Sequence, residues 1–164
     1  MEKDALRVIG SHEPDGYACP FCAMLDAQSR VVDPYLVYED ELVFSVIGLH
    51  WWTHNPGHAL IIPKEHIETL YDMPGRYSDR IHRFSRFLAL AMKAVYACDG
   101  VSTRQHNEPA GNQSVWHYHL HVLPRFKGDN LYGSEFTRAP AQRRRTCAVQ
   151  LREYFAENQP TFGD

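Results

Sequence analysis

The chain has 164 residues, which suits a single domain with its own hydrophobic core. Its formal net charge of −3 at pH 7 lacks the basic excess of a dedicated nucleic-acid binder, so we expect no nucleic-acid partner. No apolar run approaches the ~20 residues that span a bilayer, and residues 1–22 lack the apolar stretch of a secretory signal. We therefore expect a soluble, cytoplasmic protein with no membrane partner.

The first part of the chain predicts an arm, a cysteine turn and three strands. Residues 1–18 show no periodicity and predict an N-terminal arm. Residues 19–27, CPFCAMLDA, predict a knuckle that runs into a short helical turn. PYLVYED and ELVFSVIGL predict two strands around a turn at Glu39–Asp40. HWWTHNPG predicts a loop, and HALIIP at 58–63 predicts a strand that Pro63 closes.

The remainder predicts two helices and two more strands. Apolar residues at helical spacing predict a helix over roughly 79–97, which Ser78 can cap and Asp99–Gly100 ends. VSTRQHN at 101–107 predicts a strand, EPAGN a loop, and SVWHYHLHVLP the strongest strand of the chain. KGDNLYGSEFTRAP is expected to be irregular, and Pro140 can start a C-terminal helix with an apolar stripe. Together these elements predict one α+β domain with an antiparallel sheet and two helices.

The four cysteines divide into a CxxC pair and two isolated residues. Cys98 and Cys147 are expected to be small buried hydrophobes, because a reducing cytosol disfavours a disulfide framework. Cys19 and Cys22 alone leave a redox pair, half of a zinc site and two structural cysteines open. No thioredoxin-like βαβ pattern surrounds them. A structural zinc ion prefers four nitrogen or sulfur ligands, so two more would have to come from elsewhere in the chain.

Three histidines alternate with hydrophobic residues in the strongest predicted strand. Alternate side chains of a strand share a face, so His117, His119 and His121 are expected on one face and the intervening residues on the core face. Neighbouring imidazoles on that face would lie ~6–7 Å apart and cannot all be charged at low cost. They need an anion, a metal, or neutrality with hydrogen-bond partners, and a phosphate or a zinc ion would serve.

The loop before the histidines has the composition of a phosphate cradle. NEPAGNQS, residues 107–114, contains Pro and Gly, which let backbone N–H groups turn toward a ligand. Asn107, Gln113 and Ser114 add neutral donors and acceptors, which suit a phosphate ester. The composition proves nothing alone, but together with the histidines it predicts a phosphate site.

HYHLHVL, residues 117–123, matches the signature His-φ-His-φ-His-φ-φ, with φ hydrophobic, of the histidine triad (HIT) superfamily. The match extends through NEPAGNQSVWHYHLHVLPR and NPGHALIIPKEHIETL, and the chain resembles the HINT-like side of that family. This resemblance implies an arm at 1–18, a HIT domain at 19–127 and a C-terminal extension with a helix at 128–164. It also implies the HIT fold, with an antiparallel sheet of about five strands, a main helix and a C-terminal helix, and a homodimer.

The resemblance implies a covalent mechanism on a nucleotide. In this family the middle histidine, by position His119, attacks the α-phosphate of a nucleotide conjugate. The nucleotidyl-histidine intermediate then passes to water or another acceptor, which turns one hard displacement into two easier ones. The carbonyl of His117 is expected to orient His119, and Ser114 and His121 to contact phosphate or leaving-group oxygens. The implied substrate-binding residues are Asn107, Gln113, Ser114, Val115 and His121.

The resemblance also implies a zinc ion. Some HIT proteins and the related galactose-1-phosphate uridylyltransferases complete a CxxC zinc site with a histidine after PK-x-H and the first triad histidine. The matching positions here are Cys19, Cys22, His66 and His117, so we expect a structural zinc with every ligand position filled. His58 is an alternative third ligand, which we expect to face a neighbouring strand or loop instead.

The chain departs from the family pattern before the strand at 58–63. Many relatives place there an aspartate that binds ribose hydroxyls, whereas VIGLHWWTHNPGH contains none. Trp51 or Trp52 could stack on a base, or could serve packing or a dimer interface. His50, His54 and His106 are expected to flank the cleft. The basic run at 143–145 fits a solvated helix face, a contact to distal phosphates or a partner subunit.

Three functions remain open from the sequence. The first is a nucleotide hydrolase or nucleotidyl transferase that acts on dinucleoside polyphosphates, phosphoramidates or adenylylated molecules. The second is a nucleotide-binding or sensor module without meaningful turnover, for which the missing aspartate leaves room. The third is an interaction protein built on a zinc-stapled dimer. The complete triad with Ser114 favours the enzyme.

Overall fold

The computed structural model describes residues 10–26 and 34–162. Its main sheet has five strands in the order β1-β2-β4-β6-β5, and every neighbouring pair is antiparallel. These strands are β1 (Leu36–Glu39), β2 (Val43–Ile47), β4 (Ala59–Pro63), β5 (Gly100–Arg104) and β6 (Leu120–Arg125). The predicted α+β class and the antiparallel sheet of about five strands are therefore confirmed.

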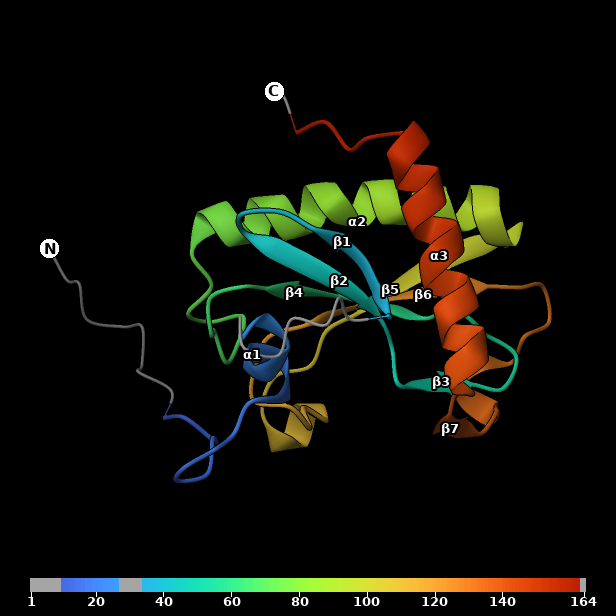
Figure 1. Cartoon of the computed structure of the whole chain (residues 1–164). Helices are drawn as coiled ribbons and strands as arrows, with labels where there is room; N and C mark the ends of the chain where they lie inside the picture. Colours follow the sequence, from blue (N-terminus) through green and yellow to red (C-terminus); the bar gives the residue numbers. More distant parts are fainter. Residues whose placement is uncertain (1–9, 27–33, 163–164) are drawn as a thin grey trace, which may run out of the picture.

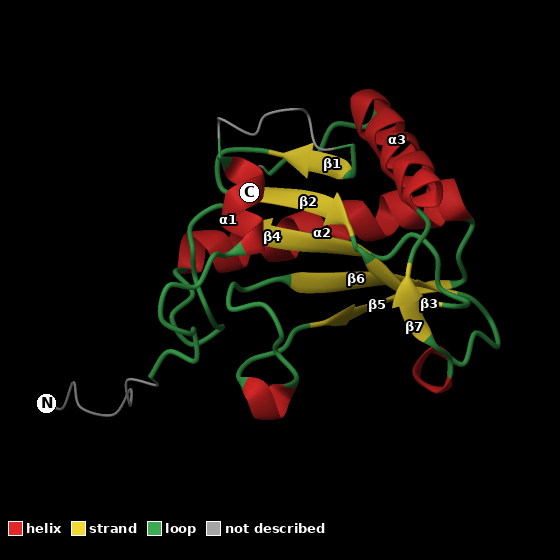
Figure 2. Ribbon diagram, turned by 60° about the horizontal axis from the view of Figure 1, so that its bottom comes forward, coloured by secondary structure: helices red, strands yellow, loops and turns green. Residues whose placement is uncertain are grey.

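Helices cover the two faces of the main sheet unequally (Figures 1 and 2). The long helices α2 (Gly75–Tyr96) and α3 (Ala141–Glu157) pack on one face, together with alternate strand residues such as Val122. The short helix α1 (Pro20–Leu25) packs on the other face against the opposite set of strand side chains. Strands β2 and β4 are buried along their whole length because both of their faces are covered. None of the described helices combines the length and apolar character that a membrane crossing needs.

The N-terminal arm is only partly visible. Residues 1–9 of the predicted arm lie outside the described part of the chain. Residues 10–18 have no helix or strand, but they are attached to the domain: the backbone N–H of His12 donates to Glu68 at 2.8 Å, and the hydroxyl of Tyr17 accepts from the backbone N–H of Trp116 at 3.2 Å. The described end of the arm is therefore held by specific contacts.

The main helix begins earlier than predicted. Helix α2 starts after Pro74, which occupies its N-cap position, and Ser78 lies inside its first turn. The helix ends at Ala97, whose φ of 52° is in the left-handed region, so termination precedes the predicted Asp99–Gly100. The predicted apolar stripe is otherwise confirmed, and its central residues Phe84 and Leu88 are fully buried.

Two segments predicted to lack regular structure pair with each other. HWWTHNPG was predicted to be a loop and KGDNLYGSEFTRAP to be irregular. Strand β3 (His50–Trp52) and strand β7 (Phe136–Arg138) lie in these segments and form a two-stranded antiparallel sheet. A short 3₁₀ helix, η3 (Leu131–Gly133), precedes β7 in the second segment. Each strand has three residues, and its partner is more than 80 positions away, so neither has a local hydrophobic pattern that would reveal it.

The strongest predicted strand begins later than its pattern suggested. Strand β6 starts at Leu120, where it pairs with Ile61 of β4, and His117 and His119 precede it. The pairing with β5 stops because β5 ends at Arg104, opposite His121. The pairing with β4 stops at Ile61 although β4 continues to Pro63, and the backbone N–H of Tyr118 donates instead to the carbonyl of Ile67. The strand predicted at 101–107 is shortened in the same way.

Helix α3 begins directly after Pro140, as predicted, and its stripe residues Leu151 and Phe155 are buried. Cys98 is buried as expected, whereas Cys147 on α3 is only half-buried. The basic run at 143–145 is not simply a solvated face. The guanidinium of Arg144 stacks 3.6 Å from the ring centroid of Tyr35 and donates to the carbonyls of Gly48 and Ile47. Arg144 therefore anchors α3 to the end of β2.

The packing of α2 against the sheet allows the cost of a core substitution to be predicted. Phe84 is 0% exposed and its ring stacks on Tyr38 at 4.2 Å. We expect Phe84→Ala to lower the free energy of unfolding by about 3–5 kcal/mol, because it removes buried surface and leaves a cavity. Chemical denaturation would measure the loss. Leu90→Ala on the exposed side of the same helix is the control, with an expected loss below about 1 kcal/mol; equal losses would contradict this account of the core.

Candidate functional site

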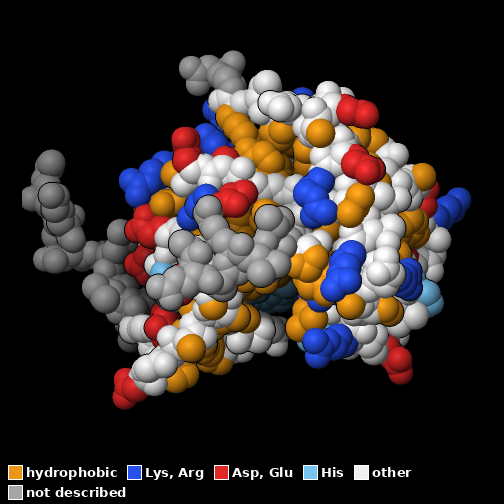
Figure 3. All heavy atoms as spheres, viewed as in Figure 1, with side chains coloured by type: hydrophobic (Ala, Val, Ile, Leu, Met, Phe, Trp, Pro, Cys, Tyr) orange, Lys and Arg blue, Asp and Glu red, His pale blue; other side chains and the backbone are white. Residues whose placement is uncertain are grey.

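A cavity of about 630 Å³ opens on the sheet face that α1 only partly covers. His119 and His121 lie at its floor, Phe21 and Met24 of α1 form one side, and Trp52 and Phe136 of the two-stranded sheet form another. Figure 3 shows hydrophobic side chains around this hollow, with histidine visible inside it. Ser114 and Val115 also line the cavity, so it collects residues from segments far apart in the sequence.

His119 is held in one protonation form by its neighbours. Its Nδ1 lies 2.8 Å from the carbonyl oxygen of His117, and since a carbonyl only accepts, Nδ1 carries the proton. Burial is the main cause that lowers the pKa of His119, so the ring is neutral at cellular pH. In a neutral ring with Nδ1 protonated, Nε2 keeps its lone pair. His119 is thus a buried imidazole with a nucleophilic nitrogen beside the cavity.

His121 and His58 form a pair of neutral imidazoles. Nδ1 of His58 donates to the carbonyl of His50 at 3.1 Å, so its Nε2 accepts from Nδ1 of His121 at 2.9 Å. Burial is the main cause that lowers the pKa of His58 to about 4 and of His121 to about 2. With Nδ1 as donor, Nε2 of His121 also has a lone pair and can accept a proton. His58 therefore lies against the triad, away from the cysteines.

The loop before the triad is locked by the side chain of Gln113, which is 5% exposed. Its amide accepts from the backbone N–H of Glu108 at 2.8 Å and donates to the carbonyls of Glu68 and Val115. Glu108 has a φ of 62°, a strained value for a residue with a side chain, and such strain persists where surrounding contacts enforce it. Gln113 supplies that enforcement at the turn (η2, Pro109–Gly111).

The predicted substrate-binding residues occupy two kinds of position. Ser114, Val115 and His121 line the cavity. Gln113 is engaged inside the loop, and Asn107 accepts from the backbone N–H of Leu70 at 2.8 Å and pairs with Gln105, so neither is among the cavity-lining residues. Contact of Asn107 and Gln113 with a substrate stays a prediction.

The flanking aromatic and histidine residues are also divided. Trp51 is 4% exposed and packs in the larger core, whereas Trp52 lines the cavity with its ring 4.3 Å from that of Phe136. His50 and His106 line the cavity as expected, and His54 instead contacts the carbonyl of Asp129 at 3.1 Å.

Arg104 also lines the cavity, although no motif in the sequence pointed to it. It occupies the last position of β5, opposite His121 of β6. Its alignment with the triad depends on strand register, so the sequence offered only a basic residue in a predicted strand as a signal.

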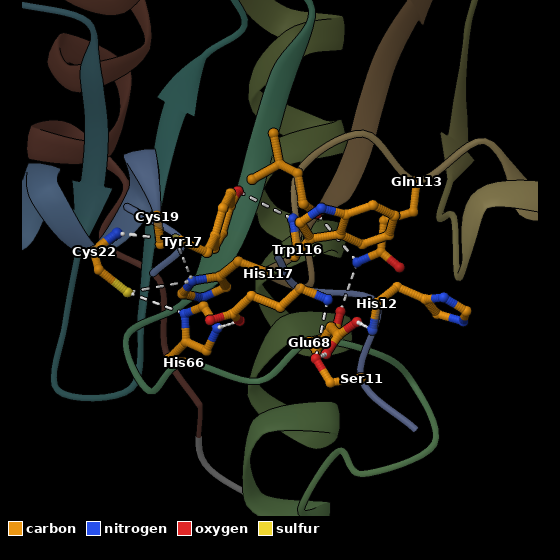
Figure 4. A network of polar contacts seen from close by, with 12 residues as sticks. Ser11, His12, Tyr17, Cys19, Cys22, His66, Glu68, Gln113, Trp116 and His117 are labelled. Carbon is orange, nitrogen blue, oxygen red and sulfur yellow. Dashed lines mark hydrogen bonds and ion pairs between the residues drawn. The ribbon is translucent and has the colours of Figure 1, made fainter. Parts of the chain in front are cut away.

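Four potential metal ligands, one of them the first histidine of the triad, meet in one cluster (Figure 4). One ligand atom from each of Cys19, Cys22, His66 and His117 lies within 4.8 Å of all the others. Sγ of Cys19 is 3.3 Å from Nδ1 of His117, and Sγ of Cys22 is 3.2 Å from Nδ1 of His66. Two sulfur and two nitrogen donors match the set that zinc prefers in closed structural sites.

The second nitrogens of both histidines have partners that orient the rings. Nε2 of His117 donates to the carbonyl of Pro63 at 2.9 Å, and Nε2 of His66 lies 2.8 Å from a carboxylate oxygen of Glu13. Such outer contacts leave Nδ1 directed at the cluster and are typical of metal-binding histidines. The residues present therefore fit a metal ion, and all four positions would be filled by the protein.

Comparison with known proteins gives consistent matches. The model of the HIT domain matches residues 29–128. An uncharacterized HIT-like protein of Borreliella burgdorferi is 33% identical over 115 residues, which cover 69% of this chain and 79% of that protein. The adenylylsulfatase HINT3 of Arabidopsis thaliana is 28% identical over 120 residues, 73% of this chain and 58% of that protein.

A solved structure agrees in both fold and sequence. The Zn-bound histidine triad family protein of Mycobacterium smegmatis superposes with a TM-score of 0.72 at 30% identity, covering 86% of this chain and 95% of that one. The range matched by the family model contains the triad and the five strands of the main sheet. The chain therefore belongs to the histidine triad (HIT) family.

Proposed function

We propose that this protein is a nucleotide hydrolase or nucleotidyl transferase that cleaves the α-phosphate linkage of a nucleotide conjugate, with His119 as the nucleophile. The observation that carries the proposal is the hydrogen bond of 2.8 Å from Nδ1 of His119 to the carbonyl of His117, because it leaves the lone pair on Nε2 of a residue that lines the cavity. Candidate substrates are dinucleoside polyphosphates, nucleoside phosphoramidates and adenylylated molecules.

The reaction would proceed in two displacements. In the first, Nε2 of His119 forms a bond to the α-phosphorus while the bond to the leaving group breaks. A phosphate leaving group departs as an anion and needs no added proton, whereas an amine leaving group takes one proton from the solvent. In the second, water or another acceptor attacks the phosphorus and the nitrogen–phosphorus bond breaks. The lone pair on Nε2 of His121 can accept a hydrogen bond from the attacking water, and the proton that the water loses passes to the solvent. The hydroxyl of Ser114, exposed at the cavity, can donate to a phosphate oxygen.

The relatives support this class of reaction without naming the substrate. The Arabidopsis relative is named an adenylylsulfatase, which supports an adenylylated molecule as one candidate. A second candidate function is a nucleotide-binding module without turnover. It is favoured by the absence of any aspartate or glutamate among the described residues that line the cavity, since a carboxylate is a usual partner for ribose hydroxyls.

We also propose that the cysteine and histidine cluster holds a structural zinc ion and that the protein is a homodimer. The donor set, the mutual distance of the ligand atoms and the oriented histidine rings support zinc. The edge position of β5, whose outer side has no strand partner among the described residues, supports pairing with a second chain.

The proposed covalent intermediate can be tested directly. Brief mixing with a panel of adenylyl and guanylyl conjugates should add the mass of one nucleotidyl group to the intact protein, as measured by mass spectrometry. His119→Ala should show no adduct, because it removes the attacking nitrogen. His82→Ala, on the exposed side of α2, is the control and should form the adduct at the wild-type rate.

Two outcomes would count against this assignment. An adduct of equal yield on His119→Ala would place the nucleophile elsewhere. No adduct and no product across the panel, with nucleotide still bound, would favour the binding module.

The proposed zinc site can be tested by its metal content. Purified protein should contain about one zinc ion per chain by elemental analysis, and Cys22→Ser should lose most of it and melt at a lower temperature. Removal of one ligand opens a closed site, and metal binding contributes to folding stability. Cys147→Ser on α3 is the matched control and should keep its zinc. A wild-type protein without zinc, or a Cys22→Ser variant with full zinc, would contradict the assignment.

A further inference from the structure

Arg104 is a cation at the cavity, and no carboxylate is found beside it in the part of the chain that the structure describes. It lines the cavity from the end of β5 and stands opposite His121 in the β5–β6 ladder. Its guanidinium lies 5.3 Å from the ring centroid of Trp52 and 5.2 Å from that of Tyr132. Among the described residues its guanidinium has no hydrogen-bond or ion-pair partner, although its backbone belongs to the β5–β6 ladder.

The two aromatic contacts position the guanidinium but leave its donors unused. Trp52 belongs to β3 and Tyr132 to η3, so two separate elements hold the planar group between them. Contacts with ring faces stabilise a cation by about 0.5–2 kcal/mol. They do not involve the N–H groups at the edge of the plane, which bind phosphate or carboxylate oxygens in pairs. Arg104 is therefore oriented and still able to bind an oxyanion.

The surrounding charges do not balance that of Arg104. No carboxylate occurs among the described residues that line the cavity. Burial is the main reason that the pKa of His58 and of His121 is lowered, and the charge of Arg104 adds to the effect, so these neighbours are neutral. Arg144, the other arginine of the cavity wall, donates instead to the carbonyls of Ile47 and Gly48. The net field at the β5 side favours an anionic ligand.

The cavity has two chemically different ends. On the α1 side, Phe21 and Met24 are apolar, and the ring of Phe21 lies 5.2 Å from that of His119. On the β5 side lie Arg104 and, across the ladder, His121, whose ring is 4.8 Å from that of His119. A nucleoside suits the apolar end, because its base has flat faces that stack on aromatic side chains. The group beyond the reacting phosphorus then lies toward Arg104.

We propose that Arg104 is a specificity-determining residue that binds a phosphate or sulfate group on the leaving-group side of the cleaved bond. The preferred substrates are accordingly nucleotide conjugates with an anionic leaving group, such as dinucleoside polyphosphates or phosphosulfates, over phosphoramidates that release an uncharged amine. This inference rests on the proposed function, since it needs a leaving group at His119.

The test compares two adenylyl donors that differ in the charge of the leaving group. Diadenosine tetraphosphate and an adenosine phosphoramidate of a neutral amine are mixed with the protein, and the rate of adenylyl-enzyme formation is followed by quenched intact-mass spectrometry. Arg104→Met removes the charge but keeps an apolar stem against Trp52 and Tyr132. Arg104→Lys keeps a charge without the planar donors. Arg86→Gln, on the exposed face of α2, makes the same change in net charge away from the cavity.

We expect Arg104→Met to slow adduct formation from diadenosine tetraphosphate by about 10- to 100-fold, the effect of losing a hydrogen bond to a charged group. The phosphoramidate rate should change less than about threefold, Arg104→Lys should lie between wild type and Arg104→Met, and Arg86→Gln should match wild type. Equal slowing of both donors, or of neither, overturns the role of Arg104. If Arg104→Met does not fold, Arg104→Lys decides: a loss confined to the tetraphosphate supports the role, and no selective loss overturns it. No wild-type adduct from either donor would instead contradict the proposed function itself.

Discussion

The triad segment depends on the buried side chain of His117. Its Nδ1 faces the cysteines, its Nε2 donates to the carbonyl of Pro63 at the end of β4, and its own carbonyl accepts from Nδ1 of His119. The residue is 0% exposed, so each of these contacts is made away from water, where an unpaired polar atom would be costly. A single residue thus connects the metal-ligand cluster, the sheet and the proposed nucleophile. A displacement of the cluster would move the atom that keeps His119 in its nucleophilic form.

The uneven covering of the sheet explains where the cavity can form. Helices α2 and α3 pack on one face, and the core there includes Val122 of β6. On the opposite face the six residues of α1 cover only part of the area, so His121, which alternates with Val122, borders open space. The arm before α1 then reaches the cluster, where Glu13 contacts His66. Packing on one side and incomplete packing on the other are both needed for the site.

The electrostatics of the cavity follow from two facts: its histidines are buried, and no carboxylate occurs among the described residues that line it. A buried imidazole is more stable neutral than charged. Two successive hydrogen bonds, from His58 to the carbonyl of His50 and from His121 to His58, each use one ring proton. The neutral imidazoles keep nitrogen lone pairs, whereas Arg104 brings a positive charge to the cavity and no described carboxylate pairs with its guanidinium. The proposed nucleophile and the proposed anion-binding residue are therefore of different types, one directly before β6 and the other at the end of β5.

The hydrophobic pattern of β2, β4 and α2 was sufficient to predict the α+β class. The triad and the CxxC pair predicted residues that meet at the cavity and in the metal-ligand cluster. They carry that information because strand alternation, helical spacing and ligand type are local properties of the sequence. The β3–β7 pair, the late start of β6 and the buried position of Arg144 were not predicted. Each depends on a partner far away in the chain: a strand for the ladder, or the carbonyls of Ile47 and Gly48 for the guanidinium.

The same distinction between local sequence features and long-range contacts applies within the site. The sequence by itself determined that imidazoles, thiols and a glycine-containing loop occur at the spacing of a nucleotide and metal site. Only the tertiary structure decided that His58 serves His121 and not the cysteines, that Gln113 and Asn107 are used inside the loop, and that Arg104 lies at the cavity. The reason is physical: the strand register and the ends of neighbouring strands determine which side chains meet, and neither is encoded in the spacing of a single segment.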